Sequence, residues 1–243
     1  MLAEAELSPQ DQSAETRTLS LDGFQGSLGQ RVYQCLRAAI LALTYRPGEI
    51  LRKPEICAAL GVSRSPVADA VARLAAEGLV EVVPQAGTFV ARFSMEEIRE
   101  GAFIREAIEV AAAERVAETI TESQLVLLRR NLVVQAALLE DGDTTGFHKT
   151  DAEMHELILG FTGFRHLAQV SDTVWIHVNR ARRLILPVPG RPAQTLDEHR
   201  AILAALEAHD PVAARAAVQR HLRQLLHYLE PLERERPELF GPR

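Results

Sequence analysis

The sequence predicts a mainly α-helical protein, with an N-terminal winged helix-turn-helix and a C-terminal all-helical antiparallel bundle. The first observation is that residues 28–92 contain three short helical patterns followed by two β-prone runs. The second is that no β-prone run follows Arg92, where apolar residues recur at helical spacing behind capping signals. We therefore divide the chain into a flexible tail over residues 1–27, a compact module over 28–92 and a helical domain over 93–243.

Charge is unevenly distributed along the chain, although the total is only −6. Residues 1–27 contain five acidic residues and one basic residue, whereas residues 28–92 contain eight basic and five acidic ones. Residues 93–243 contain eighteen basic and twenty-three acidic ones. A small cationic segment inside an acidic chain is typical of a nucleic-acid-binding module joined to another domain.

The composition excludes several classes of protein. Apolar residues make up 47% of the 243, which is normal for a chain with a real core and excludes a disordered or collagen-like protein. No apolar run approaches the ~20 residues that cross a bilayer, and the polar, acidic N-terminus lacks the pattern of a secretion signal. We therefore expect a soluble, cytoplasmic protein with no membrane partner. Cys35 and Cys57 lie in helical stretches, so we expect both to be buried thiols in a reducing compartment.

Three helices open the compact module. Apolar spacing and breakers predict them over residues 28–43, 54–60 and 66–77. Pro54 opens the second helix, where a missing N–H costs nothing, and Gly61 supplies the tight turn after it. Ser65 and Pro66 form an N-cap and first-position pair for the third helix.

A hairpin completes the module. Two β-prone runs, over residues 79–83 and 88–90, are separated by the four residues 84–87. Three helices and a hairpin in about 65 residues are the elements of a winged helix-turn-helix.

Six helices are predicted beyond the module. Ser94 with Glu97 forms a capping box, as do Thr121 with Gln124 and Thr195 with Glu198, and Asp210 with Pro211 starts the last helix. The predicted helices cover residues 94–118, 121–140, 144–159, 164–186, 195–208 and 210–229. Helices without strands favour an antiparallel bundle.

The start of the third helix holds the strongest candidates for contact with nucleic acid. The recognition helix of a helix-turn-helix enters the major groove, and its first residues meet the base edges. Arg64 can bind guanine through two hydrogen bonds, and the serines beside it can bind phosphate or base. The candidates are Arg52, Lys53, Ser63, Arg64, Ser65 and Arg73, with Gln85 and Gly87 at the hairpin tip. The alternative is that the serines only cap the helix and that Arg64 is a solvated charge.

A family resemblance lies in the segment PGEILRKPEICAALGVSRSPVADAVARLAAEGLVEVVPQAGTFV. It resembles the DNA-binding domain of GntR-superfamily regulators, and the helical remainder is similar to the FCD effector domain of the FadR subgroup. The resemblance spans about residues 28–230 and implies a protein that binds double-stranded DNA. Ala68 stands where family members usually carry an arginine that often contacts DNA, and Pro54 stands where a charged residue is common. Both departures concern operator preference and not the fold.

One carboxylate and three histidines form a candidate metal site in the helical domain. Asp151 and His155 are four residues apart on one predicted helix, so both project from the same face. His199 and His221 each lie eleven residues from Asp210, on apolar stripes of the two helices that meet there. In an antiparallel hairpin their imidazoles stand at similar heights, about 16 Å from the turn. For a single histidine the ordinary alternative is a hydrogen-bonded core residue.

Four ionisable groups that face one apolar interior need compensation, and a divalent cation supplies it. One carboxylate and three imidazoles suit Zn²⁺ or Ni²⁺ first, and Mn²⁺ or Fe²⁺ as alternatives. These four residues also match the Asp-x3-His…His…His set of metal-binding FCD domains, as the resemblance implies. Gly163 is a departure, since many relatives have asparagine there.

Open coordination positions on such a metal would accept the carboxylate of a small organic acid. The resemblance implies that Arg105 lines the effector cavity, and Arg183 is a second candidate for holding an anion. The alternative for both is a surface salt bridge, for instance between Arg105 and Glu109.

These features predict a ligand-responsive transcriptional repressor, not an enzyme, that binds an operator as a homodimer and senses a small organic acid at a metal-centred pocket. One alternative is a metal-dependent hydrolase, which activates water at the Asp/His set. It leaves the winged helix unexplained, and its nearest bases, Glu153 and Glu156, fall off the ligand face. Another alternative is a DNA-binding protein with a purely structural metal.

Overall fold

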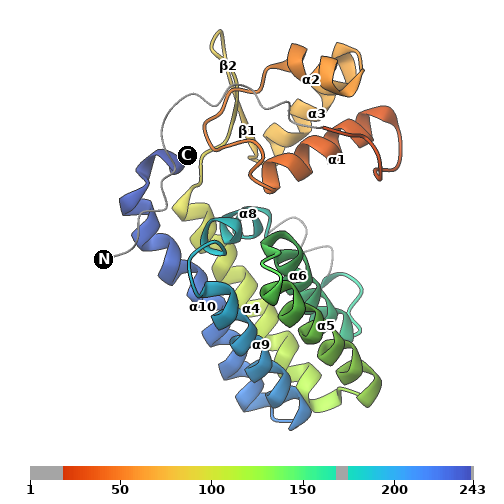
Figure 1. Cartoon of the computed structure of the whole chain (residues 1–243), viewed down its shortest axis with the longest axis vertical. Helices are drawn as coiled ribbons and strands as arrows, with labels where there is room; N and C mark the ends of the chain where they lie inside the picture. The colour runs from red at the N-terminus through yellow and green to blue at the C-terminus, as the bar shows by residue number, and fades with distance from the viewer. Residues whose placement is uncertain (1–18, 168–174, 242–243) are drawn as a thin grey trace. The chain divides into compact units, whose positions relative to one another are not determined.

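The computed structural model describes residues 19–167 and 175–241. Its contacts divide the chain into two compact units. The first consists of the residues up to Ile40 together with Thr44–Val90, and the second of Leu41–Leu43 with Ala91 onward. The architecture is mainly α-helical, with a winged helix-turn-helix followed by a helical bundle, as the sequence predicts (Figure 1).

The first unit contains three helices and a hairpin. They are α1 Leu28–Leu41, α2 Lys53–Leu60, α3 Arg64–Ala76, β1 Val80–Val83 and β2 Gly87–Val90. The strands pair antiparallel, with Val80 opposite Val90 and Val83 opposite Gly87. Val32 and Leu36 of α1 and Val67 and Leu74 of α3 are fully buried, so both helices turn their predicted apolar faces inward.

Local backbone geometry corrects three boundaries in this unit. The third helix starts at Arg64 after an N-cap at Ser63, not at Ser65, since Pro66 is tolerated throughout a first turn that has no N–H partners. The first helix ends before Leu43, whose φ of 61° is left-handed. The hairpin connection has three residues instead of four because Gly87 still pairs with Val83. Cys35 is buried as expected, whereas Cys57 is half-buried, with its sulfur 3.6 Å from the Ser63 carbonyl oxygen.

The second unit is a helical bundle. Its described helices are α4 Met95–Thr119, α5 Glu122–Glu140, α6 Thr144–Phe161, α8 Ile176–Ile185, α9 Arg191–Glu207, α10 Pro211–Glu235 and the 3-10 turn Pro237–Leu239. Three predicted caps are formed. The side chain of Ser94 accepts from Glu97 N, Thr121 and Gln124 make a reciprocal capping box, and Asp210 accepts from Ala213 N.

Three helix predictions in this unit were wrong. Residues 164–166 are not helical, and α8 begins after Trp175, whose φ of −96° and ψ of 6° interrupt a continuous helix. Residues 168–174 of that predicted helix lie outside the described residues. The helix α9 starts at Arg191 behind Gly190, which has a φ of 81°, so Thr195 lies inside the helix and donates to the Arg191 carbonyl. The helix α10 continues six residues beyond 229, since Leu232 packs on the same core cluster as Leu229.

The bundle interior lies among its long helices. Figure 1 shows α4, α9 and α10 side by side, with α5 and α6 adjoining them. Leu128, Phe147, Met154, Ile202, Leu206 and Val218 belong to one buried apolar cluster that joins α5, α6, α9 and α10. Within the described ranges, no helix is both long and apolar enough to span a bilayer.

Candidate metal centre and DNA-binding residues

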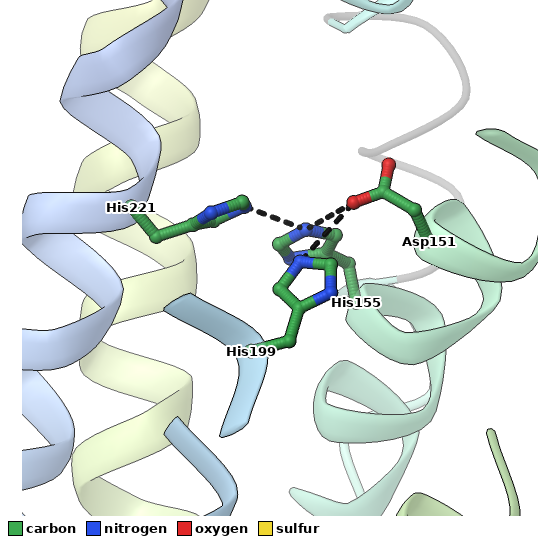
Figure 2. A group of neighbouring side chains, drawn as sticks. All are labelled: Asp151, His155, His199 and His221. Atoms are coloured by element: carbon green, nitrogen blue, oxygen red, sulfur yellow. Dashed lines mark hydrogen bonds and ion pairs between the residues drawn. The ribbon is translucent and has the colours of Figure 1, made fainter. Parts of the chain in front are cut away.

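The structure brings together the four residues that the sequence predicts as metal ligands. Asp151 and His155 come from α6, His199 from α9 and His221 from α10 (Figure 2). All four are buried, and one donor atom from each lies within 4.8 Å of the others. The spacing of four on α6 and the turn at Asp210 between α9 and α10 bring them to one point.

Each imidazole is held by a hydrogen bond at its outer nitrogen. The Nδ1 atoms of His155, His199 and His221 lie 2.6, 2.8 and 2.7 Å from Glu109 Oε2, Gln135 Oε1 and Glu198 Oε2 respectively. Ionised carboxylate and amide oxygens only accept, so the N–H of each ring is at Nδ1. In a neutral ring held this way, Nε2 carries the lone pair, which is the form that binds a metal.

The Nε2 atoms of the three imidazoles lie close to Asp151. His221 Nε2 lies 3.2 Å from His155 Nε2, and His199 Nε2 lies 3.1 Å from Asp151 Oδ1. These atoms are all acceptors, and neither His199 Nε2 nor Asp151 Oδ1 has a hydrogen-bond partner. Ligand atoms about 2.1 Å from a tetrahedral Zn²⁺ are roughly 3.4 Å apart, which is close to these separations. The donor set and its unsatisfied buried atoms therefore fit a divalent cation.

The surroundings keep the His199 and His221 rings neutral and Glu109 charged. Burial, then the neighbouring histidines and arginines, lowers the pKa of His199 and of His221 well below the usual value. Burial by itself raises the pKa of the Glu109 carboxyl, but Arg105 and His155 together hold it below its usual range. Neutral rings and an ionised second-layer carboxylate are both favourable for metal binding.

A second layer of buried charge surrounds the four residues. Arg105 Nε lies 2.5 Å from Glu109 Oε1, and Arg182 forms an ion pair with Asp151. Arg191 binds Glu198 through two hydrogen bonds of 2.8 and 2.9 Å. Each acidic side chain in or next to the quartet thus has its own arginine.

Arg105 and Arg183 lie in different surroundings. Arg105 forms the pair with Glu109 that was the alternative prediction, but the pair is buried and linked to His155 instead of standing at the surface. Arg183 is half-buried on α8, and Arg182 is the residue of that helix that pairs with Asp151. Burial, with Arg182 and then Arg183, lowers the pKa of His148 to about 3.

Sequence reasoning missed five residues of the second layer. They are Glu109, Gln135, Arg182, Arg191 and Glu198. Gln135 carried a signal, since it is a polar side chain on the apolar face of α5. Glu198 fits the capping pattern predicted with Thr195, and Arg191 precedes the predicted start of that helix.

The candidate DNA-binding residues lie in the first unit. Ser63, Arg64 and Ser65 are exposed at the start of α3, and the side chain of Ser63 makes no capping hydrogen bond. Gln85 is exposed at the hairpin tip, with a φ of 63°. The Arg73 guanidinium lies 3.7 Å above the Tyr33 ring.

A cavity brings three of the remaining candidates together. Arg52, Lys53 and Gly87 line a space of about 480 Å³ between the start of α2 and the hairpin. Arg52 is exposed and lies 3.7 Å from Glu55. Two basic side chains and the backbone of the hairpin therefore lie around one space within the first unit.

Two parts of the chain match known protein families. Residues 28–90 match the model of bacterial regulatory proteins of the gntR family, and residues 100–224 match the FCD domain. The chain is 32% identical to the HTH-type transcriptional repressor RspR of Escherichia coli K12, over 88% of this chain and 94% of that protein. The chain belongs to the GntR family.

Other GntR-family proteins agree with the assignment. An HTH-type regulator from an unstable DNA locus of Streptomyces ambofaciens is 34% identical over 86% of this chain and 88% of that protein. The crystal structure of a GntR transcriptional regulator from Rhodococcus sp. RHA1 superposes with a TM-score of 0.72 at 26% identity, covering 83% of this chain and 99% of that one. This GntR-family protein is thus a DNA-binding transcriptional regulator and not an enzyme, and the hydrolase alternative is wrong.

Proposed function

We propose that this regulator is a cytoplasmic repressor of the FadR subgroup that binds a two-fold operator as a homodimer. Residues 28–92 bind DNA, and residues 93–243 sense a small organic acid at a metal centre. The buried quartet with every Nε2 aimed inward is the observation that carries the sensing half. The similarity of the chain to RspR, a transcriptional repressor, supports the direction of regulation.

Asp151, His155, His199 and His221 would hold the metal. The ligand set suits Zn²⁺ or Ni²⁺, with Mn²⁺ and Fe²⁺ as alternatives that the same donors accommodate. When bound, the metal would supply a positive charge that attracts an oxyanion. Glu109, Gln135 and Glu198 orient three of the ligands, since each accepts the Nδ1 hydrogen of one ring.

The charge of the buried site favours an acidic ligand. Arg105 with Glu109, Arg182 with Asp151 and Arg191 with Glu198 form three balanced pairs around the imidazoles. A divalent metal would therefore add two uncompensated positive charges to a buried site, which is unfavourable without an anion. A carboxylate-bearing molecule supplies that anion, and Arg105 and Arg182, which pair with Glu109 and Asp151, are the cations that would hold it.

A purely structural metal is the second candidate. One observation favours it, because four buried protein ligands are the full set of a closed structural site. The two functions differ in whether a small molecule changes DNA affinity, since only a ligand that binds two states unequally shifts their populations.

The test is a DNA-binding titration with sugar acids, hydroxy acids and dicarboxylates, run on metal-loaded and metal-free protein. We expect one class to release DNA from the loaded protein, with a coupling of ~1–3 kcal/mol. Release from metal-free protein or from Arg105→Ala at the same concentration would contradict sensing at the metal. Native mass spectrometry before and after denaturation identifies the metal, any carried acid and the dimer mass.

A further inference from the structure

One arginine of the bundle is buried without a counter-charge. Arg180 of α8 is 1% exposed, and none of its three side-chain nitrogens has a hydrogen-bond partner in the part of the chain that the structure describes. Burial lowers the pKa of Arg180 to about 10, so the guanidinium remains charged at neutral pH. A buried charge that is neither paired nor hydrogen-bonded is strongly unfavourable. The side chain therefore needs an acceptor.

The three other buried arginines among the described residues each pair with a carboxylate. The pairs are Arg105 with Glu109, Arg182 with Asp151 and Arg191 with Glu198. All three belong to the surroundings of the metal centre. Arg180 thus stands apart from them both in its lack of an acid and in the side chains that it contacts.

Aromatic rings surround the unpaired guanidinium. The Cζ atom of Arg180 lies 4.4 Å from the centre of the Phe93 ring, and that ring lies 5.8 Å from the ring of Phe240. The same buried cluster contains Trp175, whose Nε1 is a second buried donor without a partner. Both groups only donate hydrogen bonds, so a molecule that satisfies them must be an acceptor.

A carboxylate meets these requirements best. Its two oxygens match the fork of a guanidinium, and its single negative charge balances that of Arg180. A phosphate dianion would leave an excess negative charge in an apolar environment. Water can accept from some of the N–H groups but leaves the charge uncompensated.

The Phe93 ring covers the guanidinium, and its segment is held by a short pairing with a second segment. Phe93 N donates to the Leu239 carbonyl oxygen over 3.0 Å, and Gly241 N donates to the Phe93 carbonyl oxygen over 3.0 Å. A pairing of so few residues can open locally while the rest of the bundle stays folded. Such an opening gives a small anion a route to Arg180.

We propose that Arg180 binds a small carboxylate beside Phe93, at a site separate from the metal centre. Phe93 follows Val90, the last residue of the first unit, by three positions. The carboxylate would therefore lie next to the segment through which the chain enters the bundle. This proposal uses none of the four candidate metal ligands, so it stands or falls independently of sensing at the metal.

The experiment is an acetate titration of full-length, metal-free protein, with sodium chloride adjusted to keep the ionic strength constant. Trp175 is the only tryptophan in the sequence, so its fluorescence and its indole N–H signal in NMR spectra report on this cluster. We expect both signals to change saturably. The melting temperature should rise by at least about 2 °C, since a ligand that binds only the folded state stabilises it. Acetamide, which is similar in shape but neutral, should have no effect.

Arg180→Met replaces the charge with an apolar side chain. It should abolish the response to acetate. In acetate-free buffer its melting temperature should exceed that of the wild type, because a buried unpaired charge has been removed. An arginine with a merely structural role would give the opposite sign. Arg180→Lys keeps a charge but loses the fork, so it should weaken acetate binding at least tenfold.

Arg115→Met is the matched control. The Arg115 guanidinium also lies over a phenylalanine ring, 4.7 Å from the centre of Phe164, but Arg115 is exposed and donates to the Thr162 carbonyl oxygen. This variant should respond to acetate as the wild type does. Loss of the response in the control as well would show that the effect is not specific to Arg180 and would contradict the site.

Two further results would overturn the inference. A wild type whose tryptophan signals and melting temperature do not respond to acetate would show that water satisfies the buried guanidinium. An Arg180→Met protein that still responds would place the acetate elsewhere. Either result leaves the proposed metal centre and the release of DNA to be judged by their own titration.

Discussion

At the scale of single residues, the outer nitrogen of each histidine decides what its inner nitrogen can do. A ring with a free Nδ1 can rotate or change tautomer, whereas a ring with an acceptor at Nδ1 presents a fixed lone pair. Gln135 provides that acceptor for His199 from a different helix, at 2.8 Å. It is the one neutral acceptor of the three, so it can be removed without changing the charge of the site.

Gln135→Leu should weaken metal affinity about 10- to 100-fold and leave the stoichiometry at saturation unchanged. The reason is that His199 loses its orientation but remains a ligand. Competition with a fluorescent chelator measures the affinity. Gln219→Leu removes a comparable bond to Glu106 away from the centre and should leave the affinity unchanged; equal losses in both variants would contradict an orienting role.

Replacement of both His199 and His221 by alanine should abolish stoichiometric metal. The melting temperature of wild-type protein should rise with added metal, while that of the double variant should not, since a ligand that binds only the folded state stabilises it. Elemental analysis after dialysis gives the content. His227→Ala, on the exposed side of α10, is the control, and full occupancy in the double variant would show that the ligands are wrongly assigned.

Arg64→Ala should weaken operator binding far more than binding to random DNA. A two-bond contact to guanine is worth about 1–3 kcal/mol, and phosphate contacts alone do not discriminate sequence. Fluorescence anisotropy with both duplexes at one salt concentration measures the ratio. Arg200→Ala, an exposed arginine of α9, should change neither affinity. An equal loss on both duplexes would contradict base recognition by Arg64.

At the scale of elements, the helix boundaries that could be predicted were those set by a capping side chain at the boundary itself. Ser94, Thr121 and Asp210 start α4, α5 and α10 through side-chain caps that the sequence displays. The start of α9 was missed because it depends on the left-handed backbone of Gly190, a conformation that glycine permits but does not require.

The same distinction applies to the metal centre. The clustering of the four proposed ligands was predictable, since two lie four residues apart and two lie symmetrically about a turn. The acceptors that hold the three rings were not, because these hydrogen bonds join residues 46, 64 and 23 positions apart. Such pairs follow from how helices dock, and no local spacing encodes them.

The helices α4 and α10 are joined across their exposed edge by Glu106 and Arg223, 2.8 Å apart. The hydrogen bonds from Arg223 lower the pKa of Glu106 against the opposing effect of burial. A carboxyl whose pKa is lower in the folded than in the unfolded protein stabilises the fold at pH values above its unfolded pKa of about 4.3. That stabilisation is lost as the pH falls through the folded pKa.

Glu106→Gln should therefore reduce the free energy of unfolding at pH 7 by about 0.2–1 kcal/mol, and the difference should shrink below pH 4. Urea unfolding of metal-free protein at several pH values measures it. A double-mutant cycle with Arg223→Ala isolates the pair. A difference in unfolding free energy that grows as the pH falls would contradict the lowered pKa of Glu106.

At the scale of the whole molecule, the proposed homodimer would impose a spacing on the operator through its two DNA-binding units. Half-sites one helical turn apart, or a multiple of it, face the same side of the duplex. Insertion of five base pairs between the half-sites should lower affinity at least tenfold, and insertion of ten should restore part of it. Gel-shift titration of the three duplexes measures this. Insensitivity to spacing would contradict simultaneous binding by two units.

The order of the two units along the chain has a consequence during synthesis. The DNA-binding unit ends at Val90, while the metal ligands extend from Asp151 to His221. At about 5–20 residues per second, on the order of 10 s separates these two points on the ribosome, and domains generally fold as units from the N-terminus. A newly made chain thus holds a folded DNA-binding unit before its proposed metal ligands have all been synthesised, so each molecule could bind DNA before it could sense the proposed acid.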